Sequence, residues 1–161
     1  MSIETSPVKR TTIFCKNIEL SLQLYRDILG FNVVEDKVVS GPAIAKMIGL
    51  KDCSMHICHL CSQNSNDGLI GLYEVTSGEV PQTVKPKVGQ LHFGQVAIVL
   101  NTNEPDNLYT KLIDNNYSFL THPTSYTKKQ DSEYMKAGIY TEMIFYDPDS
   151  VLVSVLGYTK L

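Results

Sequence analysis

Five residues between positions 53 and 61 are of types that bind metals or act as nucleophiles: Cys53, His56, Cys58, His59 and Cys61. Thiolates and imidazoles are ligands that Zn²⁺ prefers, and the Cys58-x-x-Cys61 spacing is one that zinc sites use. No second Cys-x-x-Cys or spaced histidine pair accompanies it. On a strand, His56 and Cys58 share one face while His59 and Cys61 share the other, so four ligands do not converge. We therefore predict half-buried strand residues here.

The remaining candidates for catalysis are isolated. From the sequence, either His56 with Cys58 or else His59 faces a binding site. His92, next to a predicted strand, suits a catalytic base or, more commonly, a partly exposed residue at a strand entry. His122 precedes a proline and is predicted to lie in a loop, where Tyr126 and Tyr134 would form a lid. The chain has no Gly-x-Ser-x-Gly, Walker or dinucleotide-binding motif.

The composition is that of an ordinary folded domain. The chain has 161 residues, of which 43% are hydrophobic and 19% are charged, with a net charge of −3. This charge is too small to favour nucleic acid or a membrane surface as a partner. No apolar run is long enough to span a bilayer, and the first ten residues lack the apolar region of a signal peptide. We therefore expect a cytoplasmic protein, with four reduced cysteines.

The elements that position these residues follow a β-α-β-β-β order in the first half. A strand at 9–16 is followed by a helix that Asn17 caps and Gly30 ends. The remaining predicted elements are a strand that starts at 31–34, a short helix at 43–49, and strands at 54–60 and 69–75. Residues 76–90 carry two prolines and two glycines and read as a linker.

The second half repeats this order. It contains a strand at 93–100, a helix from Pro105, strands at 117–120, 140–146 and 151–156, and a long polar loop at 122–138. Aligning Tyr25 with Tyr109 gives a shift of 109 − 25 = 84 residues, which places Thr11 on Gln95. We predict a first βαβββ module at 8–76, a linker at 77–91 and a second module at 92–161, with one joint core.

Three stretches resemble the glyoxalase/bleomycin resistance/dioxygenase superfamily, also called the vicinal oxygen chelate superfamily. The first, NIELSLQLYRDILGFNV at 17–33, is similar to its opening pattern Asp-Leu-x-x-Ser-x-x-Phe-Tyr-x-x-x-Leu-Gly-Phe, with Asn17 in place of Asp. The others are IGLYE at 70–74 and FYDPDSVLVSVL at 145–156, where Ser150 stands for the glycine of an Asp-Pro-Asp-Gly turn. The resemblance implies an α+β fold in which two βαβββ modules form a half-barrel cup, usually in a homodimer.

The resemblance also implies four positions that bind a metal in the metal-dependent relatives, and here they fall on Thr11, Gly71, Gln95 and Ser154. Only Gln95 has a suitable side chain, and Gln is a weak neutral ligand. We therefore predict no bound metal at these positions and no cofactor. Glu74 lies close to a position where relatives carry Glu, but residues 71 and 74 of a strand face opposite sides, so we interpret Glu74 as a solvated strand-end residue.

The function that we favour from the sequence is metal-free binding of a small organic molecule in the cup. The predicted ligand-binding residues are Thr11, Gly71, Tyr73, Gln95 and Ser154. Gly71 would leave space above the cup floor, and Tyr73 on the same face would either stack on a planar ligand or pack in the core. The superfamily includes drug-sequestering resistance proteins, although neutral anchors disfavour a strongly cationic drug. The alternatives are a metal-dependent lyase, isomerase or dioxygenase with displaced ligands, and a partner-binding scaffold with a collapsed cup.

Overall fold

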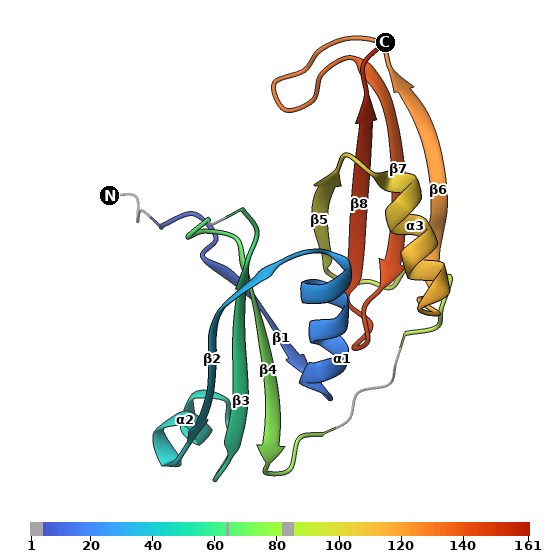
Figure 1. The fold of residues 1–161 in the computed structure, drawn as a ribbon. Helices are drawn as coiled ribbons and strands as arrows, with labels where there is room; N and C mark the ends of the chain where they lie inside the picture. The colour runs from blue at the N-terminus through green and yellow to red at the C-terminus, as the bar shows by residue number, and fades with distance from the viewer. Residues whose placement is uncertain (1–4, 64, 82–85) are drawn as a thin grey trace. The chain divides into compact units, whose positions relative to one another are not determined.

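A computed structural model describes residues 5–63, 65–81 and 86–161 of the chain (Figure 1). The chain divides into two compact units, Met1–Thr83 and Val84–Leu161, and the division falls inside the segment predicted as a linker. Each unit consists of one four-stranded sheet and the helices that pack on it. No helix in the described part of the chain is long and apolar enough to cross a membrane.

The first unit follows the predicted β-α-β-β-β order. Its elements are β1 (Arg10–Cys15), α1 (Ile18–Leu22), η1 (Gln23–Ile28), β2 (Asn32–Ser40), α2 (Pro42–Met47), β3 (Ser54–Cys61) and β4 (Leu69–Ser77). The strands lie in the order β1-β4-β3-β2, with β1 parallel to β4 and the other neighbours antiparallel.

Two side chains hold the start of α1. The Asn17 Oδ1 atom accepts hydrogen bonds from the backbone N–H groups of Glu19 and Leu20 at 3.0 and 3.2 Å, which confirms the predicted cap. Glu74 Oε2 accepts the N–H of Ile18 at 3.0 Å. The interpretation of Glu74 as a solvated strand-end residue is therefore wrong, because its carboxylate satisfies a backbone donor that the helix leaves unpaired.

The helix continues beyond α1 as the π-helical segment η1, in which the Leu29 N–H bonds to the Leu24 carbonyl at 2.9 Å. Gly30 then ends it with a φ of 76°, as predicted. The helix packs on the sheet face that carries Ile13, Leu60 and Leu72, which are all buried. We call this the helix face.

The short helix α2 packs on the opposite side of the first sheet. Ala45 is fully buried there against Met55 and Ile57 of β3, with Tyr73 and Val75 of β4 beside them. We call this side the open face. Residues two apart on a strand share a face, and cross-strand partners point the same way. The open face therefore carries Arg10, Thr12, His59, Gly71 and Tyr73. One end of the open face is therefore covered by α2.

The second unit repeats the topology. It contains β5 (Ala97–Thr102), α3 (Pro105–Asp114), β6 (Phe119–Lys128), β7 (Gly138–Tyr146) and β8 (Leu152–Thr159), in the order β5-β8-β7-β6. The predicted α+β fold of two βαβββ modules is confirmed. Asp147 Oδ1 accepts the N–H groups of Asp149 and Val151 in the predicted turn, where Ser150 has a φ of 73°.

Two predictions for the second unit are wrong. The strand expected at 93–100 starts at Ala97, so Gln95 precedes it. The loop expected at 122–138 is shorter, because β6 extends to Lys128 and β7 starts at Gly138. Cross-strand contacts extend this hairpin: the Ser125 and Thr141 hydroxyls lie 2.9 Å apart, and the rings of Tyr126 and Tyr140 stack at 5.6 Å. Tyr126 is thus a strand residue, whereas Tyr134 lies in the remaining loop.

Candidate functional site

The open face of the first unit holds a polar network built from all four strands. Arg10 comes from β1, Tyr73 from β4, His59 from β3 and Glu35 from β2. The strand register brings them together: His59 is the cross-strand partner of both Gly71 and Glu35, and Tyr73 follows two residues after Gly71. We therefore treat this network as the candidate functional site.

Arg10 lies across the strand surface rather than extending into solvent. Its Nε atom donates to Thr12 Oγ1 at 3.0 Å, and its Cζ atom is 5.3 Å from the centroid of the Tyr73 ring. A guanidinium over an aromatic face is held by the negative potential of the ring. The path of the side chain depends on Gly71, since a Cβ atom on Gly71 would lie only 2.7 Å from Arg10 Cδ.

His59 is the centre of the network. Its Nδ1 atom lies 2.7 Å from Glu35 Oε2, and its Nε2 atom lies 2.9 Å from Arg10 Nη1 and 3.0 Å from the Tyr73 hydroxyl. Arg10 can only donate, so Nε2 is an acceptor and the ring proton sits on Nδ1, facing Glu35. Burial lowers the pKa of His59, with a further contribution from the Arg10 charge. A neutral imidazole is consistent with this hydrogen-bonding pattern.

The charge balance of the network favours an anion. Glu35 is the carboxylate that reaches His59, and its pKa is lowered mainly by a hydrogen bond from Lys37 at 2.7 Å. Among the residues that the structure describes, no carboxylate forms an ion pair with Arg10. Next to the guanidinium, the Tyr73 ring packs edge-on against Phe14 at 5.8 Å and supplies an aromatic surface. The site can therefore hold a negatively charged group beside a planar apolar one.

The second unit has its own polar and aromatic face, opposite α3. The Ser154 hydroxyl donates to Glu142 Oε1 at 2.7 Å. Further along β7, the ring of Tyr140 contacts Tyr126 of β6 and Tyr158 of β8, at centroid distances of 5.6 and 5.2 Å. Burial raises the pKa of Tyr126, and the charge of Glu142 adds to that shift. This face is a row of three tyrosines beside one carboxylate.

The residues predicted to bind a ligand are divided between the two units. Gly71 and Tyr73 lie together on the open face, as predicted. Thr11 does not join them: it pairs with buried Ile70 and therefore faces the helix, whereas Thr12 pairs with Gly71. Gln95 and Ser154 belong to the second unit.

The Gln95 amide shows one unusual feature. Its Oε1 atom accepts the backbone N–H of His92 at 3.2 Å. Its Nε2 atom is buried and has no hydrogen-bond partner among the described residues.

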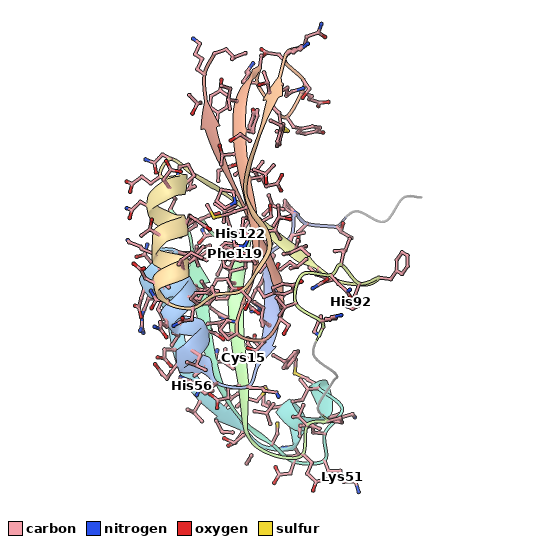
Figure 2. The ribbon with its side chains drawn as sticks, turned by 90° about the vertical axis from the view of Figure 1, so that its right-hand side faces the viewer. Cys15, Lys51, His56, His92, Phe119 and His122 are labelled. Carbon is pink, nitrogen blue, oxygen red and sulfur yellow. The ribbon has the colours of Figure 1, made fainter. Side chains whose placement is uncertain are left out.

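The two histidines of the second unit, His92 and His122, have different surroundings. His92 is an exposed residue of the loop before β5, whereas it was predicted to lie directly at the entry of a strand. His122 is a residue of β6 rather than of a loop, and its ring stacks on Phe119 at 4.9 Å and bonds to the Tyr109 hydroxyl at 3.0 Å. Figure 2 shows His122 and Phe119 side by side, with His92 away from them. These contacts hold the His122 ring against its neighbours, although the residue is exposed.

The positions at which the resemblance implies metal ligands do not suit a metal. Gly71 has no side chain, and the Arg10 guanidinium occupies the space above it, where it would repel a cation. Thr11 faces the other way, and the Ser154 hydroxyl is bonded to Glu142. Within the described residues, the cluster of histidine, cysteine and carboxylate groups that could hold an ion lies elsewhere, at Asp36, His56 and Cys58.

Asp36, His56 and Cys58 lie on the helix face of the first unit. The predicted pairing of His56 with Cys58 on one strand face is confirmed, and His59 faces the opposite side. His56 Nε2 is 2.7 Å from Asp36 Oδ1 and 3.7 Å from Cys58 Sγ. Burial raises the pKa of the Cys58 thiol to about 12, and the nearby Asp36 charge adds to the shift. A protonated, fully buried thiol is a poor nucleophile.

The sequence analysis missed three polar residues: Arg10 and Glu35 on the open face of the first unit, and Glu142 on the polar face of the second unit. The signal for Arg10 was available, because residues 10 and 12 alternate with Thr11 along the strand. Glu35 carried no such signal because only the start of its strand, at 31–34, was predicted. Glu142 carried none because the strand at 140–146 was predicted without assigning its residues to a face.

Comparisons with known proteins bear on the family. The family model described as Glyoxalase/Bleomycin resistance protein/Dioxygenase superfamily matches residues 8–155. No curated protein gives a significant match to the chain. The glyoxalase family protein from Bacillus cereus has a similar crystal structure, with a TM-score of 0.74 at 12% identity over 97% of this chain and 96% of that one.

A glyoxalase/dioxygenase from Nostoc punctiforme has a TM-score of 0.59 at 16% identity, over 99% of this chain and 100% of the other. A superfamily member from Sphaerobacter thermophilus gives 0.53 at 17% identity, over 95% and 98% of the two chains. At these identities the likeness concerns the fold alone. The family-model match over nearly the whole length shows that the chain belongs to the Glyoxalase/Bleomycin resistance protein/Dioxygenase superfamily.

Proposed function

We propose that this protein binds a small organic molecule with a carboxylate or similar anionic group on the open face of its first unit, and that it does so without a metal at that face. The observation that carries the proposal is the Arg10 guanidinium, held by Thr12 and His59 over the Tyr73 ring without a carboxylate partner among the described residues. A preoriented guanidinium forms charge-assisted hydrogen bonds with a carboxylate at little cost in side-chain entropy.

The neighbours of Arg10 define the rest of the ligand. Tyr73 and Phe14 offer an aromatic surface next to the charge, which suits a planar or apolar body. His59 accepts the Arg10 hydrogen bond and donates to Glu35, so it helps to orient the guanidinium. An aromatic carboxylate is therefore the class of ligand that this arrangement favours over a neutral or cationic molecule.

A defined set of probes tests the proposal. Benzoate, benzamide and benzylamine share one ring and differ in charge, and ligand-observed NMR measures their binding to the full chain. We expect benzoate to bind most tightly, and Arg10→Gln to weaken benzoate by about 10- to 100-fold, the loss of ~1.5–3 kcal/mol that one charged hydrogen bond contributes. Arg26→Gln, which removes an exposed arginine paired with Asp27, is the matched control. Equal binding of the three probes, or equal binding by Arg10→Gln, would contradict the proposal.

A second function is favoured by one observation, the chain of contacts from Glu35 through His59 to the Tyr73 hydroxyl. The two nitrogens of His59 face different partners, which is the arrangement of an acid–base relay. We propose this relay as the basis of a metal-independent isomerase or lyase activity. Deuterium incorporation into 2-oxobutyrate in D₂O, followed by NMR, would reveal proton abstraction beside a carbonyl. Such exchange should disappear in Tyr73→Phe, and its absence from the wild-type protein would favour binding alone.

The homodimer that the family resemblance implies is also a proposal. Analytical ultracentrifugation at several protein concentrations measures the mass of the particle in solution. We expect twice the mass of the chain, and a monomer at all concentrations would remove this part of the proposal.

A further inference from the structure

The helix face of the first unit holds a group of side chains that the proposed function does not use. Asp36 of β2 is the direct cross-strand partner of Cys58 of β3, and His56 lies two residues before Cys58 on the same face. One donor atom from each of the three, a carboxylate oxygen, an imidazole nitrogen and a thiol sulfur, lies within 4.8 Å of the other two. Both strands are paired along this stretch, so the backbone beneath the three side chains is fixed.

The contacts in this group differ from those of a catalytic relay. In a relay, the two ring nitrogens of histidine face different partners, as they do in His59. Here the single atom His56 Nε2 faces both Asp36 Oδ1, at 2.7 Å, and Cys58 Sγ, at 3.7 Å. Cys58 has no exposed surface, so its sulfur cannot reach a substrate. Three donor atoms within 4.8 Å of one another can bind the same cation.

We propose that Asp36, His56 and Cys58 bind one divalent zinc-like ion on the helix face of the first unit. The ligand types decide the class of metal, since thiolate and imidazole select Zn²⁺ over Mg²⁺ and Ca²⁺, which require oxygen ligands. Three protein ligands leave the fourth tetrahedral position to water or to another small ligand. This site lies on the face opposite Arg10 and Tyr73, so it is independent of the ligand proposed above.

The distances between the donors agree with this metal. Around a tetrahedral Zn²⁺, the usual bond lengths place a sulfur and a nitrogen ligand about 3.6 Å apart, and a nitrogen and an oxygen ligand about 3.3 Å apart. The sulfur and nitrogen of Cys58 and His56 are already 3.7 Å apart. The oxygen of Asp36 is now 2.7 Å from His56 Nε2 and must move away from it. Its side chain is 58% exposed, which leaves room for this movement.

The surrounding charges also favour a cation. The exposed carboxylate of Asp36 lies within 4.8 Å of the Cys58 sulfur, and the guanidinium of Arg26 is bonded to Asp27 at 2.7 Å. His56 keeps 24% of its side chain exposed, so an ion can enter from the solvent beside Asp36.

Metal titration of the chelator-treated full chain tests the proposal. We expect one Zn²⁺ per chain in competition with a chromophoric chelator, and Co²⁺ should give the absorption of a tetrahedral ion with a sulfur-to-cobalt charge-transfer band. Asp36→Asn and His56→Gln should each weaken Zn²⁺ binding by at least about 10- to 100-fold. Mutating a residue that only supports a metal ligand already costs this much, and these two residues are ligands themselves. Cys58→Ser should abolish the charge-transfer band.

Two control variants match the ligands in type. Cys61→Ser replaces another buried cysteine, and His92→Gln replaces an exposed histidine; both should bind Zn²⁺ as the wild type does. Far-UV circular dichroism establishes that each variant is folded. If Cys58→Ser fails to fold, Asp36→Asn decides the matter, because its side chain is exposed. Wild-type binding no tighter than that of Asp36→Asn and His56→Gln, or a Co²⁺ spectrum without a sulfur band, would overturn the proposal.

Discussion

Arg10 lies directly over Gly71, so that a Cβ atom added to Gly71 would be 2.7 Å from Arg10 Cδ and 3.1 Å from its Nε. The glycine therefore does more than continue the strand. It leaves the space through which the arginine side chain crosses from β1 to His59 and Tyr73. The position of the positive charge on the open face thus depends on the absence of a side chain on the neighbouring strand.

Gly71→Ala should weaken benzoate binding by about tenfold or more, because Arg10 must leave the position in which it can meet a carboxylate; this corresponds to ~1.4 kcal/mol. The stability of the fold should change less than affinity, since the new methyl group meets the Arg10 side chain and the edge of the Tyr73 ring, at 3.1 Å, rather than backbone. Ligand-observed NMR and urea unfolding measure the two quantities on the same protein.

A double-mutant cycle identifies the cause of that loss. If Gly71→Ala acts through Arg10, it should have no further effect on benzoate binding in the Arg10→Gln background. Additive losses would mean instead that the glycine contacts the ligand itself.

The order of the elements could be predicted because each depends on local signals. Asn17 caps α1, Gly30 ends the helix, and the Asp147 turn separates β7 from β8, all as the sequence indicates. These features need only a few neighbouring residues, so no knowledge of the sheet is required. Strand lengths were predicted less accurately because they depend on contacts with the neighbouring strand. The β6–β7 hairpin, for example, extends through cross-strand contacts such as that of Tyr126 with Tyr140.

The site could be predicted only in part because it depends on register. The repeat was aligned with a shift of 84 residues, which matched Thr11 to Gln95. In the structure, the parallel partners of the equivalent positions Gly71 and Ser154 are Thr12 and Val99, a shift of 99 − 12 = 87 residues. The predicted and observed shifts differ by three residues. Because side chains alternate between the two faces of a strand, an odd difference assigns every residue of the first strand to the wrong face. Arg10 was lost from the prediction for this reason.

Contacts across four strands carry still less sequence signal. Glu35 meets His59 because a bulge between Val33 and Glu35 changes the register of β2, and that bulge has no glycine or proline to mark it. Glu74 was assigned to the correct face, opposite Gly71, but its bond to the Ile18 N–H requires the helix to be placed first.

His59 should make the stability of the protein depend on pH below 6.5. Burial and the Arg10 charge lower its pKa from the ordinary value of 6.5 in the folded state. Between the folded and unfolded pKa values, the unfolded chain therefore binds more protons than the folded one, and stability falls as the pH falls. Urea unfolding at pH 7.5 and 5.5, above the range in which carboxylates titrate, should show a larger loss in the wild type than in His59→Gln.

The chemical shift of the His59 ring measures the same effect directly. An NMR titration should give this histidine a pKa below 6.5, and a value above 6.5 would mean that Glu35 rather than burial and Arg10 controls it.

Removing the carboxylate of Glu74 should destabilise α1. Glu74→Ala leaves the Ile18 N–H without its partner, and helix-capping changes of this kind cost about 0.5–2 kcal/mol. Urea unfolding measures the loss, with Glu133→Ala, a change in an exposed loop residue, as the control. Glu74→Gln should be milder than Glu74→Ala, because an amide oxygen can still accept the bond. Equal stability of Glu74→Ala and the control would show that water replaces the cap.

Gly138→Ala should destabilise the second unit far more than Gly71→Ala destabilises the first. A Cβ atom on Gly138 would lie 2.3 Å from the Tyr158 ring and 2.8 Å from the Thr159 carbonyl oxygen, and the latter belongs to the backbone of the paired strand. Neither neighbour can move away without breaking contacts, since the Tyr158 hydroxyl donates to the Ala137 carbonyl and its ring packs on Tyr140. Such overpacking costs about 1–3 kcal/mol. Urea unfolding of both alanine variants provides the comparison, and equal losses would contradict the distinction between a backbone contact and a side-chain contact.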